Sequence, residues 1–598
     1  MRSNTTITHR TLGHASHCRN SSGQTHRLAR ESGVRPGSPA SALSGCQTVK
    51  SEHTVNHFRQ IILWPLQLMP LADNAGQHHW ELLEQNRSDS PWRRVENKFT
   101  GNKRSGGPGF QERYYKEFVT FPPYVQRFLY GESRSLNMPH TEDPPGDSAL
   151  KIFRRHDVAA LRLTLHTDAA PILLAVPFVG LYFFDDIDVV FLKVEVTASH
   201  LPLTTVRDIM YRFGRAYPTG WDDVGQGVHN AAKVEWLATD GHCIASSDFD
   251  NRDKFLSFTR WHRAPCSSSH WAFLLRPLAL DPSEEVGEIR YRQIEHHRMP
   301  LMAYVAVDDP RSISREEWIR LGLIATLHPE EPIPIHDSDV TEFNIRYCYD
   351  RFWTNTDTGS NTRYLCSGRA LIVVGDARES YFLNSDRGIL AHFRHQYFIL
   401  FLIAHLHRAA LLIFSDRLVD AIHDMDIKQA SSVNKFRQRI HSSFDAFLRF
   451  THRYWFHEIS ERPHMQSLFR LCSNWLGNDA LYDEVKEELR DMSQYLDSDA
   501  QRRQSTTVVR LTVVTTISLV GTVATGFLGM NIIDEANAPI LLRWSYFFLT
   551  ILGTVAFVLF SIMKSRRLSE LMDILSDNRT PLRTRFALIA ASSRQPRP

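Results

Sequence analysis

The residues best suited to chemistry in this sequence lie in a short polar loop near the C-terminus, between two uncharged segments. The tripeptide Gly529-Met530-Asn531 precedes this loop, and Asp534 and Glu535 follow within it. An Asn amide oxygen is a neutral acceptor that can bind the water shell of a cation, whereas carboxylates attract cations by charge. These residue types could therefore bind or attract a cation, although ordinary solvated loop charges are the alternative for the two acids.

The uncharged segments that flank the loop are each long enough to cross a membrane. Residues 511–530 and 544–563 contain no charged side chain. About 20 apolar residues span a hydrocarbon layer of about 30 Å as a helix. Because only residues 531–543 separate them, we predict a tight transmembrane hairpin with an outer loop that carries Asn531.

Basic residues determine the expected orientation of this hairpin. Three of them precede the first uncharged segment, and three follow the second: Arg502, Arg503, Arg510, Lys564, Arg566 and Arg567. The loop itself contains one arginine, Arg543. The positive-inside rule therefore predicts that both termini are cytoplasmic. We expect a multi-pass protein of the cell membrane, with the mitochondrial inner membrane as the alternative.

The first segment is the more polar of the two, with five threonines and three glycines between Leu511 and Met530. Stepping by 100° per residue places an alternation of apolar, hydroxyl and small groups on one helical face. These residues are Leu511, Thr515, Leu519, Thr522 and Gly526. Small and hydroxylated residues either line a wet path or allow helices to pack closely. We predict a pore lining, and plain helix packing is the alternative.

The polar segment upstream of the hairpin is predicted to continue the same helix. Residues 479–530 contain no proline, and their first glycine is Gly521. A helix of this length would extend for roughly 78 Å. We interpret 479–530 as a stalk helix that becomes the first transmembrane span.

The long region before the stalk is expected to be an α/β domain followed by a helical bundle. Apolar runs at 170–184, 189–196, 301–307 and 370–375 predict strands, and 201–217 predicts a helix capped by Thr204 or Thr205. Residues 392–418 are apolar enough for a span, but His405, His407 and Arg408 would be costly at mid-bilayer. We therefore predict a buried helix there.

The resulting domain map has seven parts. They are a disordered extension (1–68), a cytosolic α/β domain (69–384), a cytosolic helical bundle (385–478), the stalk and first span (479–530), the outer loop (531–543), the second span (544–563) and a basic cytoplasmic tail (564–598). The fold class is thus an α/β cytosolic domain, a long-helix bundle with a stalk, and a C-terminal transmembrane hairpin.

Composition and motifs exclude several functional classes. Lysine and arginine number 69 against 66 acids, a net charge of +3, so a nucleic-acid partner is not expected. The seven cysteines show no C-x-x-C spacing, which argues against a zinc site. Hydrolase, metalloprotease and nucleotide-binding motifs are absent from the sequence, so we predict neither an enzyme nor a resident cofactor.

The stretch GFLGMNI at the end of the first segment resembles the signature of the CorA family of divalent-cation (Mg²⁺) channels. Members of that family carry Gly-Met-Asn at the outer end of the first of two C-terminal spans. The resemblance covers the stalk, both spans, the loop and the basic flank. It implies that Gly529, Met530 and Asn531 determine ion selectivity, and that the chain forms a homopentamer.

In that family arrangement, a ring of five Asn531 side chains would hold Mg²⁺ through its hydration waters, without stripping them. Mg²⁺ sheds its waters reluctantly, so neutral acceptors are suitable ligands for the hydrated ion. We therefore expect a Mg²⁺ channel, with Mg²⁺ as the transported ion and a candidate regulator of gating. The alternatives are transport of Zn²⁺, Co²⁺ or Ni²⁺, or a membrane-anchored sensor or scaffold.

Overall fold

The structure is a computed structural model of the full chain. It describes residues 53–71, 78–85, 90–95, 112–131, 148–184, 187–285, 287–295, 297–325, 336–353, 361–423, 430–529 and 539–576. The chain divides into two units, 1–51 and 52–598, and all the described residues lie in the second.

A 15-stranded mixed sheet forms the centre of the α/β region, with its main path ordered β13-β14-β15-β12-β1-β6-β5-β4-β8-β9. The strands are β1 (Thr54–Leu68), β2 (Trp92–Arg94), β3 (Leu150–Arg155), β4 (Ala160–Thr164), β5 (Ile172–Phe184), β6 (Val189–Ala198), β7 (Leu201–Pro202), β8 (Lys233–Leu237), β9 (Cys243–Ser246), β10 (Ala279–Leu280), β11 (Arg290–Gln293), β12 (Leu301–Val307), β13 (Cys348–Tyr349), β14 (Arg363–Cys366) and β15 (Ala370–Asp376). Most neighbours are antiparallel, and β12 pairs with β15 in parallel.

Strand β1 lies in the middle of this sheet and corrects the predicted N-terminal boundary. The expected disordered extension, 1–68, is wrong for residues 54–68, because β1 pairs with β6 along one edge and with β12 and then β11 along the other. Successive β1 side chains face opposite sides of the sheet and enter two separate apolar cores. Ile62 and Trp64 enter one core, whereas Ile61 and Leu63 enter the other.

The first core lies under the shorter helices of the α/β region. These are α1 (His79–Gln85), α4 (Leu203–Arg212), α5 (Arg252–His262), α6 (Ser269–Leu275), α7 (Arg315–Leu323) and α8 (Asp337–Tyr347), with a 3₁₀ turn at Pro310–Ser312. Helix α4 corrects a predicted cap. Its N-cap is Pro202, without a side-chain hydrogen bond, so neither Thr204 nor Thr205 caps it.

The second core is covered by helices that come mostly from the C-terminal half of the chain. They are α2 (Glu112–Phe118), α3 (Pro123–Tyr130), α9 (Ser380–Leu383), α10 (Ile389–His392), a π-helical turn (Phe393–Tyr397), α11 (Phe398–His423), α12 (Ala430–Arg453) and α13 (Pro463–Leu476). Strand and helix side chains interdigitate here, as in the stack of Tyr304 on Phe382, with ring centroids 4.6 Å apart.

Helix α11 is apolar but lies inside the fold. The helical run Ile389–His423 has the hydropathy of a membrane span, yet 78% of its apolar 18-residue window is buried within the protein. Its polar groups find internal partners: the ring of His407 bonds to the Tyr454 carbonyl at 2.6 Å, and Arg408 Nε donates to Glu295 at 2.7 Å. This agrees with the buried helix predicted for 392–418.

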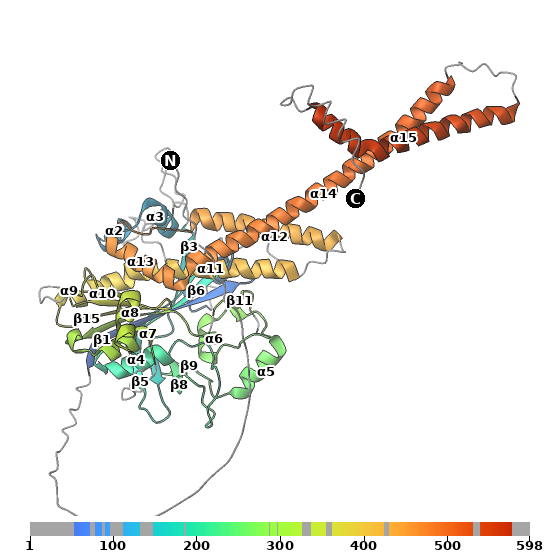
Figure 1. Ribbon diagram of the computed structural model, residues 1–598. Coiled ribbons are helices and arrows are strands. Elements are labelled where there is room, and N and C mark those ends of the chain that lie inside the picture. The colour runs from blue at the N-terminus through green and yellow to red at the C-terminus, as the bar shows by residue number, and fades with distance from the viewer. Residues whose placement is uncertain are drawn as a thin grey trace, which may run out of the picture. The chain divides into compact units, whose positions relative to one another are not determined.

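The C-terminal part is a pair of long helices. Helix α14 is one continuous helix from Asn478 to Gly529, and α15 extends from Ile540 to Ser576 (Figure 1). The start of α14 packs on α11, and its end packs along α15. Among the described residues, Ile540–Phe557 qualifies as a candidate span and has none of its length buried, and Val514–Gly526 is a shorter apolar stretch. Within the predicted hairpin, the described residues therefore give one candidate span by length and composition, on α15, and one shorter apolar stretch, on α14.

Candidate ion pathway

The predicted pore-lining residues share one surface of α14. Leu511, Thr515, Leu519, Thr522 and Gly526 are all exposed. Leu511 and Leu519 retain 64% and 59% of their full accessibility, which is high for leucine. A face this apolar cannot remain in contact with water alone. It must meet lipid, a second copy of the chain, or a pore.

The opposite face of α14 packs on α15. Ala524 is 4% exposed, and Thr516 and Val520 are half-buried. At 100° per residue, these three positions are centred roughly 140° from the middle of the Leu511–Gly526 face, with Ala524 directly opposite it and Thr516 nearest to it. The chain therefore uses one face of α14 for its own hairpin and leaves the other without an intramolecular partner among the described residues.

Threonine hydroxyls on the exposed face donate their hydrogens back to the helix. Thr522 Oγ1 donates to the Ser518 carbonyl at 2.9 Å, and Thr515 Oγ1 donates to the Thr512 carbonyl at 2.9 Å. A hydroxyl whose hydrogen is used this way still has acceptor capacity on its oxygen. These two positions therefore present oxygen acceptors on the exposed face, and hydration waters of a cation, which point their hydrogens outward, could donate to them.

The predicted selectivity residues lie at the edge of the described chain. Gly529 is the last residue of α14 and is exposed. Met530, Asn531, Asp534 and Glu535 fall outside the described residues. The structure thus gives the position of the helix end that carries the tripeptide, and the ion-binding role of Asn531 stays a prediction.

Within the described part of the chain, His, Cys, Asp and Glu side chains do not gather into any group of three suited to a metal ion. Two acids of the α/β region, Asp188 and Asp308, have side-chain partners. Asp188 pairs with Arg417 at 2.6 Å, and Asp308 accepts from Asn56 Nδ2 at 2.5 Å.

Residues 419–567 match the family model of the CorA-like Mg²⁺ transporter protein. This is the family recognised from the sequence. The match begins near the end of α11, includes α12, α13 and α14, and ends in α15 at Arg567, the last of the basic residues that follow the predicted second span. The C-terminal quarter of the chain is thus CorA-like, and the sheet lies outside the match. Comparison with curated proteins gave no match.

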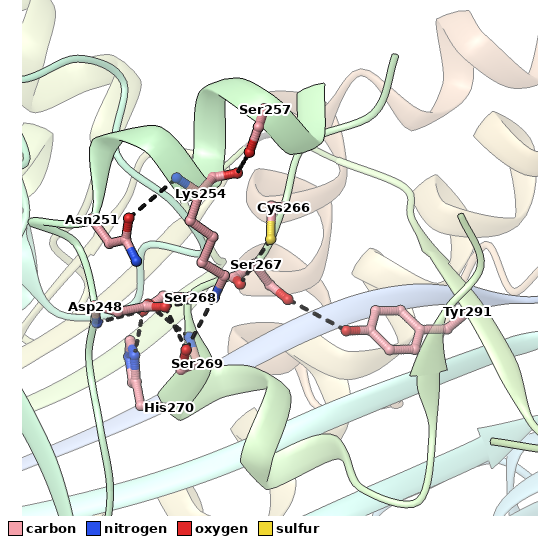
Figure 2. Close-up of polar contacts among 10 residues, drawn as sticks. All are labelled: Asp248, Asn251, Lys254, Ser257, Cys266, Ser267, Ser268, Ser269, His270 and Tyr291. Carbon is pink, nitrogen blue, oxygen red and sulfur yellow. Dashed lines mark hydrogen bonds and ion pairs between the residues drawn. The ribbon is translucent and has the colours of Figure 1, made fainter. Parts of the chain in front are cut away.

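The family consists of transporters, but the α/β region contains one cluster of residue types that also occur in hydrolases. Figure 2 shows Asp248, Ser268 and His270 bonded in a row. Ser268 Oγ lies 2.6 Å from Asp248 Oδ1 and 2.9 Å from His270 Nδ1. A hydrolytic triad needs the imidazole between the hydroxyl and the carboxylate. Here the serine is central, and both Ser268 and His270 are fully buried.

This cluster fits a structural role. Asp248 also accepts from the Ser269 backbone at 2.9 Å and from Lys254 Nζ at 2.5 Å, so it fastens the starts of α5 and α6 together. Burial lowers the pKa of His270 to about 3, which makes its imidazole a poor base at neutral pH. Asp248 and Ser268 are 20 residues apart, and no local motif signals the cluster.

A second polar group that the sequence analysis missed lies between the sheet and the π-helical turn. Glu195 on β6 contacts Arg59 on β1, and it lies 3.7 Å from Lys193 and 3.4 Å from Arg394. Burial opposes ionisation of Glu195, but the three cations hold its pKa below the ordinary value. Burial likewise lowers the pKa of Lys193 to about 8. The sequence did contain a signal for this group. Lys193 and Glu195 are two residues apart in an apolar strand, which places both charges on the same face of the sheet.

Proposed function

We propose that the chain is a passive Mg²⁺ channel, built on the divalent-cation transporter architecture that the CorA-like match supports. The observation that carries the proposal is the match over 419–567, because it covers the helix pair whose first member ends at Gly529-Met530-Asn531. Flux would follow the concentration gradient and the membrane potential acting on a double charge. Asn531 from each subunit would accept hydrogen bonds from the waters of the ion.

Five copies would place the Leu511–Gly526 face of α14 around a central axis, with α15 on the outside. The exposed apolar and hydroxyl face supports this arrangement, because α15 already occupies the opposite face. The threonine acceptors would replace bulk water around the hydrated ion, and Leu511 and Leu519 would form apolar constrictions that close by dewetting. Asp534 and Glu535 would raise the local cation concentration outside.

We further propose that both termini lie on the cytoplasmic side of the cell membrane. The basic residues on both flanks of the hairpin support this orientation. The mitochondrial inner membrane, with the termini in the matrix, is the alternative location.

The decisive experiment measures Mg²⁺ uptake into liposomes that contain only the purified full chain. Asn531→Ala should abolish uptake and leave the size of the assembled oligomer unchanged, because it removes the acceptors and keeps both helices. Uptake by the variant at the parent rate would contradict the proposal. Parallel assays with Zn²⁺, Co²⁺ and Ni²⁺ decide between ions, and no flux of any ion would favour a membrane-anchored sensor.

A further inference from the structure

A cavity of about 600 Å³ lies beside the second core, whose residues Phe128 and Trp455 are part of its lining. One wall comes from α3, with Tyr124, Arg127 and Phe128. The other comes from the end of α12 and residues 454–458 that follow it. A hydrogen bond from Tyr124 Oη to the Glu458 carbonyl, 2.5 Å long, joins the two walls. The volume is in the range of sites that hold small organic ligands.

Two arginines, Arg127 and Arg453, are the cations that line this cavity, and both are exposed. His452 and His457 add exposed imidazoles to the lining. Glu458 is the acid among the lining residues, and it is already paired with Arg470 at 3.3 Å. Arginine binds phosphate through two parallel hydrogen bonds, so this lining favours a phosphorylated or otherwise anionic ligand.

The remaining lining is aromatic. Tyr124 is 40% exposed, so its ring can still accept a planar group, whereas Phe128, Tyr454, Trp455 and Phe456 form a buried wall behind it. An inorganic ion would use the arginines and leave most of the cavity and its aromatic wall without contacts. A ligand that combines an anion with a ring system would use both parts of the lining.

We propose that this cavity binds a nucleoside phosphate, with its phosphates on Arg127 and Arg453 and its base against Tyr124. A lipid headgroup, the other common source of phosphate, lies out of reach. Trp455 stacks on Tyr482 of α14, and about 44 Å of helix separates Tyr482 from the first span at Leu511. The ligand is therefore a soluble one.

The same stack connects the cavity mechanically to the helix that carries the first apolar segment. Trp455 and Tyr482 are 4.5 Å apart between ring centroids and nearly parallel, and Tyr482 belongs to the continuous helix that ends at Gly529. A ligand that shifts the 454–458 segment would move the base of α14. This coupling rests on the proposed channel function, whereas nucleotide binding itself does not.

Binding is tested by calorimetric titration of the detergent-solubilised full chain with ATP, in the presence of EDTA. Saturable binding of ATP is expected, with much weaker binding of inorganic phosphate. Arg127→Gln and Arg453→Gln should each weaken ATP binding about tenfold or more, because each loses a charge-assisted contact. Tyr124→Ala should weaken ATP but not phosphate. Arg260→Gln, an exposed arginine on α5, is the matched control and should bind like the parent.

Absence of saturable ATP heat would overturn the proposal, as would parent-like affinity in both arginine variants. Phosphate that binds as tightly as ATP would overturn the role of the aromatic wall. An unchanged thermal unfolding midpoint in each variant separates lost binding from lost folding. In liposomes, ATP on the cytoplasmic side should change flux at constant free Mg²⁺. If ATP binds without altering flux, only the proposed coupling is overturned. If the parent chain shows no flux at all, the proposed channel function is overturned.

Discussion

At the scale of single residues, Glu195 is the position outside the hairpin where we expect a substitution to cost the most stability. Its buried carboxylate interacts with three cations. Its side chain is 3% exposed, and those of Lys193 and Arg59 are 7% and 11% exposed. Lys193 Nζ also lies 3.8 Å from the centroid of the Phe398 ring, on the first turn of α11. Removing the charge of Glu195 would leave buried cations facing one another, which costs more than an ordinary lost ion pair.

Glu195→Gln is therefore expected to destabilise the protein by about 3 kcal/mol or more. The substitution preserves shape and some hydrogen bonding, so the loss reports the charge. The measurement is the thermal unfolding of the purified full chain.

Glu458→Gln is the matched control for this substitution. Glu458 pairs with Arg470 at the surface, where both side chains are more than half exposed, and such pairs contribute at most about 1 kcal/mol. If both substitutions destabilise the protein equally, burial of the Glu195 ion pairs does not increase their contribution to stability.

The candidate ion pathway could be proposed from the sequence at this scale, because its signals are local. A tripeptide at the end of an uncharged helix and a periodicity of 100° both lie within one segment. The shared carboxylate of Glu195 was not readable in the same way. Its partners Arg59 and Arg394 are distant in sequence and meet it only through sheet pairing and a helix crossing.

At the scale of elements, the two faces of α14 give a direct comparison. Thr522 lies on the exposed face, and Thr516 on the face toward α15, where it is half-buried. Valine has nearly the shape of threonine without the hydroxyl. Thr522→Val should lower Mg²⁺ flux several-fold, because the pathway loses one water acceptor per subunit.

Thr516→Val provides the control on the same helix. Its hydroxyl donates to the Thr512 carbonyl at 2.6 Å, on the side of the helix that faces α15. Flux close to that of the parent is expected. A larger loss of flux in Thr516→Val than in Thr522→Val would mean that the ion pathway does not follow the exposed face of α14.

Helix α11 makes stability depend on pH. His405 and His407 are fully buried, and burial lowers the pKa of each imidazole to about 4. They are neutral in the folded chain but titrate near pH 6.5 when it unfolds. Above pH 6.5 the two imidazoles do not lower the free energy of unfolding. As the pH falls toward 4 that free energy decreases, by about 2 kcal/mol for each imidazole at pH 5.

The unfolding midpoint should therefore fall between pH 7.5 and pH 5, and His407→Gln should flatten this dependence. The exposed His441 on α12 offers a matched control, since His441→Gln leaves both buried imidazoles in place. His441→Gln should keep the pH dependence of the parent. If His407→Gln keeps it as well, the His407 imidazole is not a source of that dependence.

Strand β1 shows why some elements could not be predicted. A proline inside a run argues against a central strand, because it cannot donate to a neighbour. Pro65 nevertheless lies within β1. The pairing with β12 ends at Ile62 and that with β11 begins at Leu66, so Pro65 falls in the gap between two partners on that edge. Runs such as Val189–Ala198 and Leu301–Val307 contain no proline, and their strands follow the predicted ranges closely.

At the scale of the whole molecule, β1 joins the two cores. Eight of its apolar side chains are buried, distributed over both faces of the sheet. At about 1.5 kcal/mol or more for each, these side chains contribute roughly 12 kcal/mol. Domains of this kind are stable by only about 5–15 kcal/mol in total, so loss of β1 would remove a stabilisation as large as the whole margin.

A chain that begins at Met69 is therefore expected not to fold, whereas a chain that begins at Glu52 retains β1 and should fold. Size-exclusion chromatography and thermal unfolding of the detergent-solubilised proteins make the comparison. The Glu52 chain should form the same oligomer as the parent and unfold cooperatively, and the Met69 chain should aggregate. A folded Met69 chain would mean that β6 and β12 can close the sheet without β1, because β1 lies between them along its whole central portion.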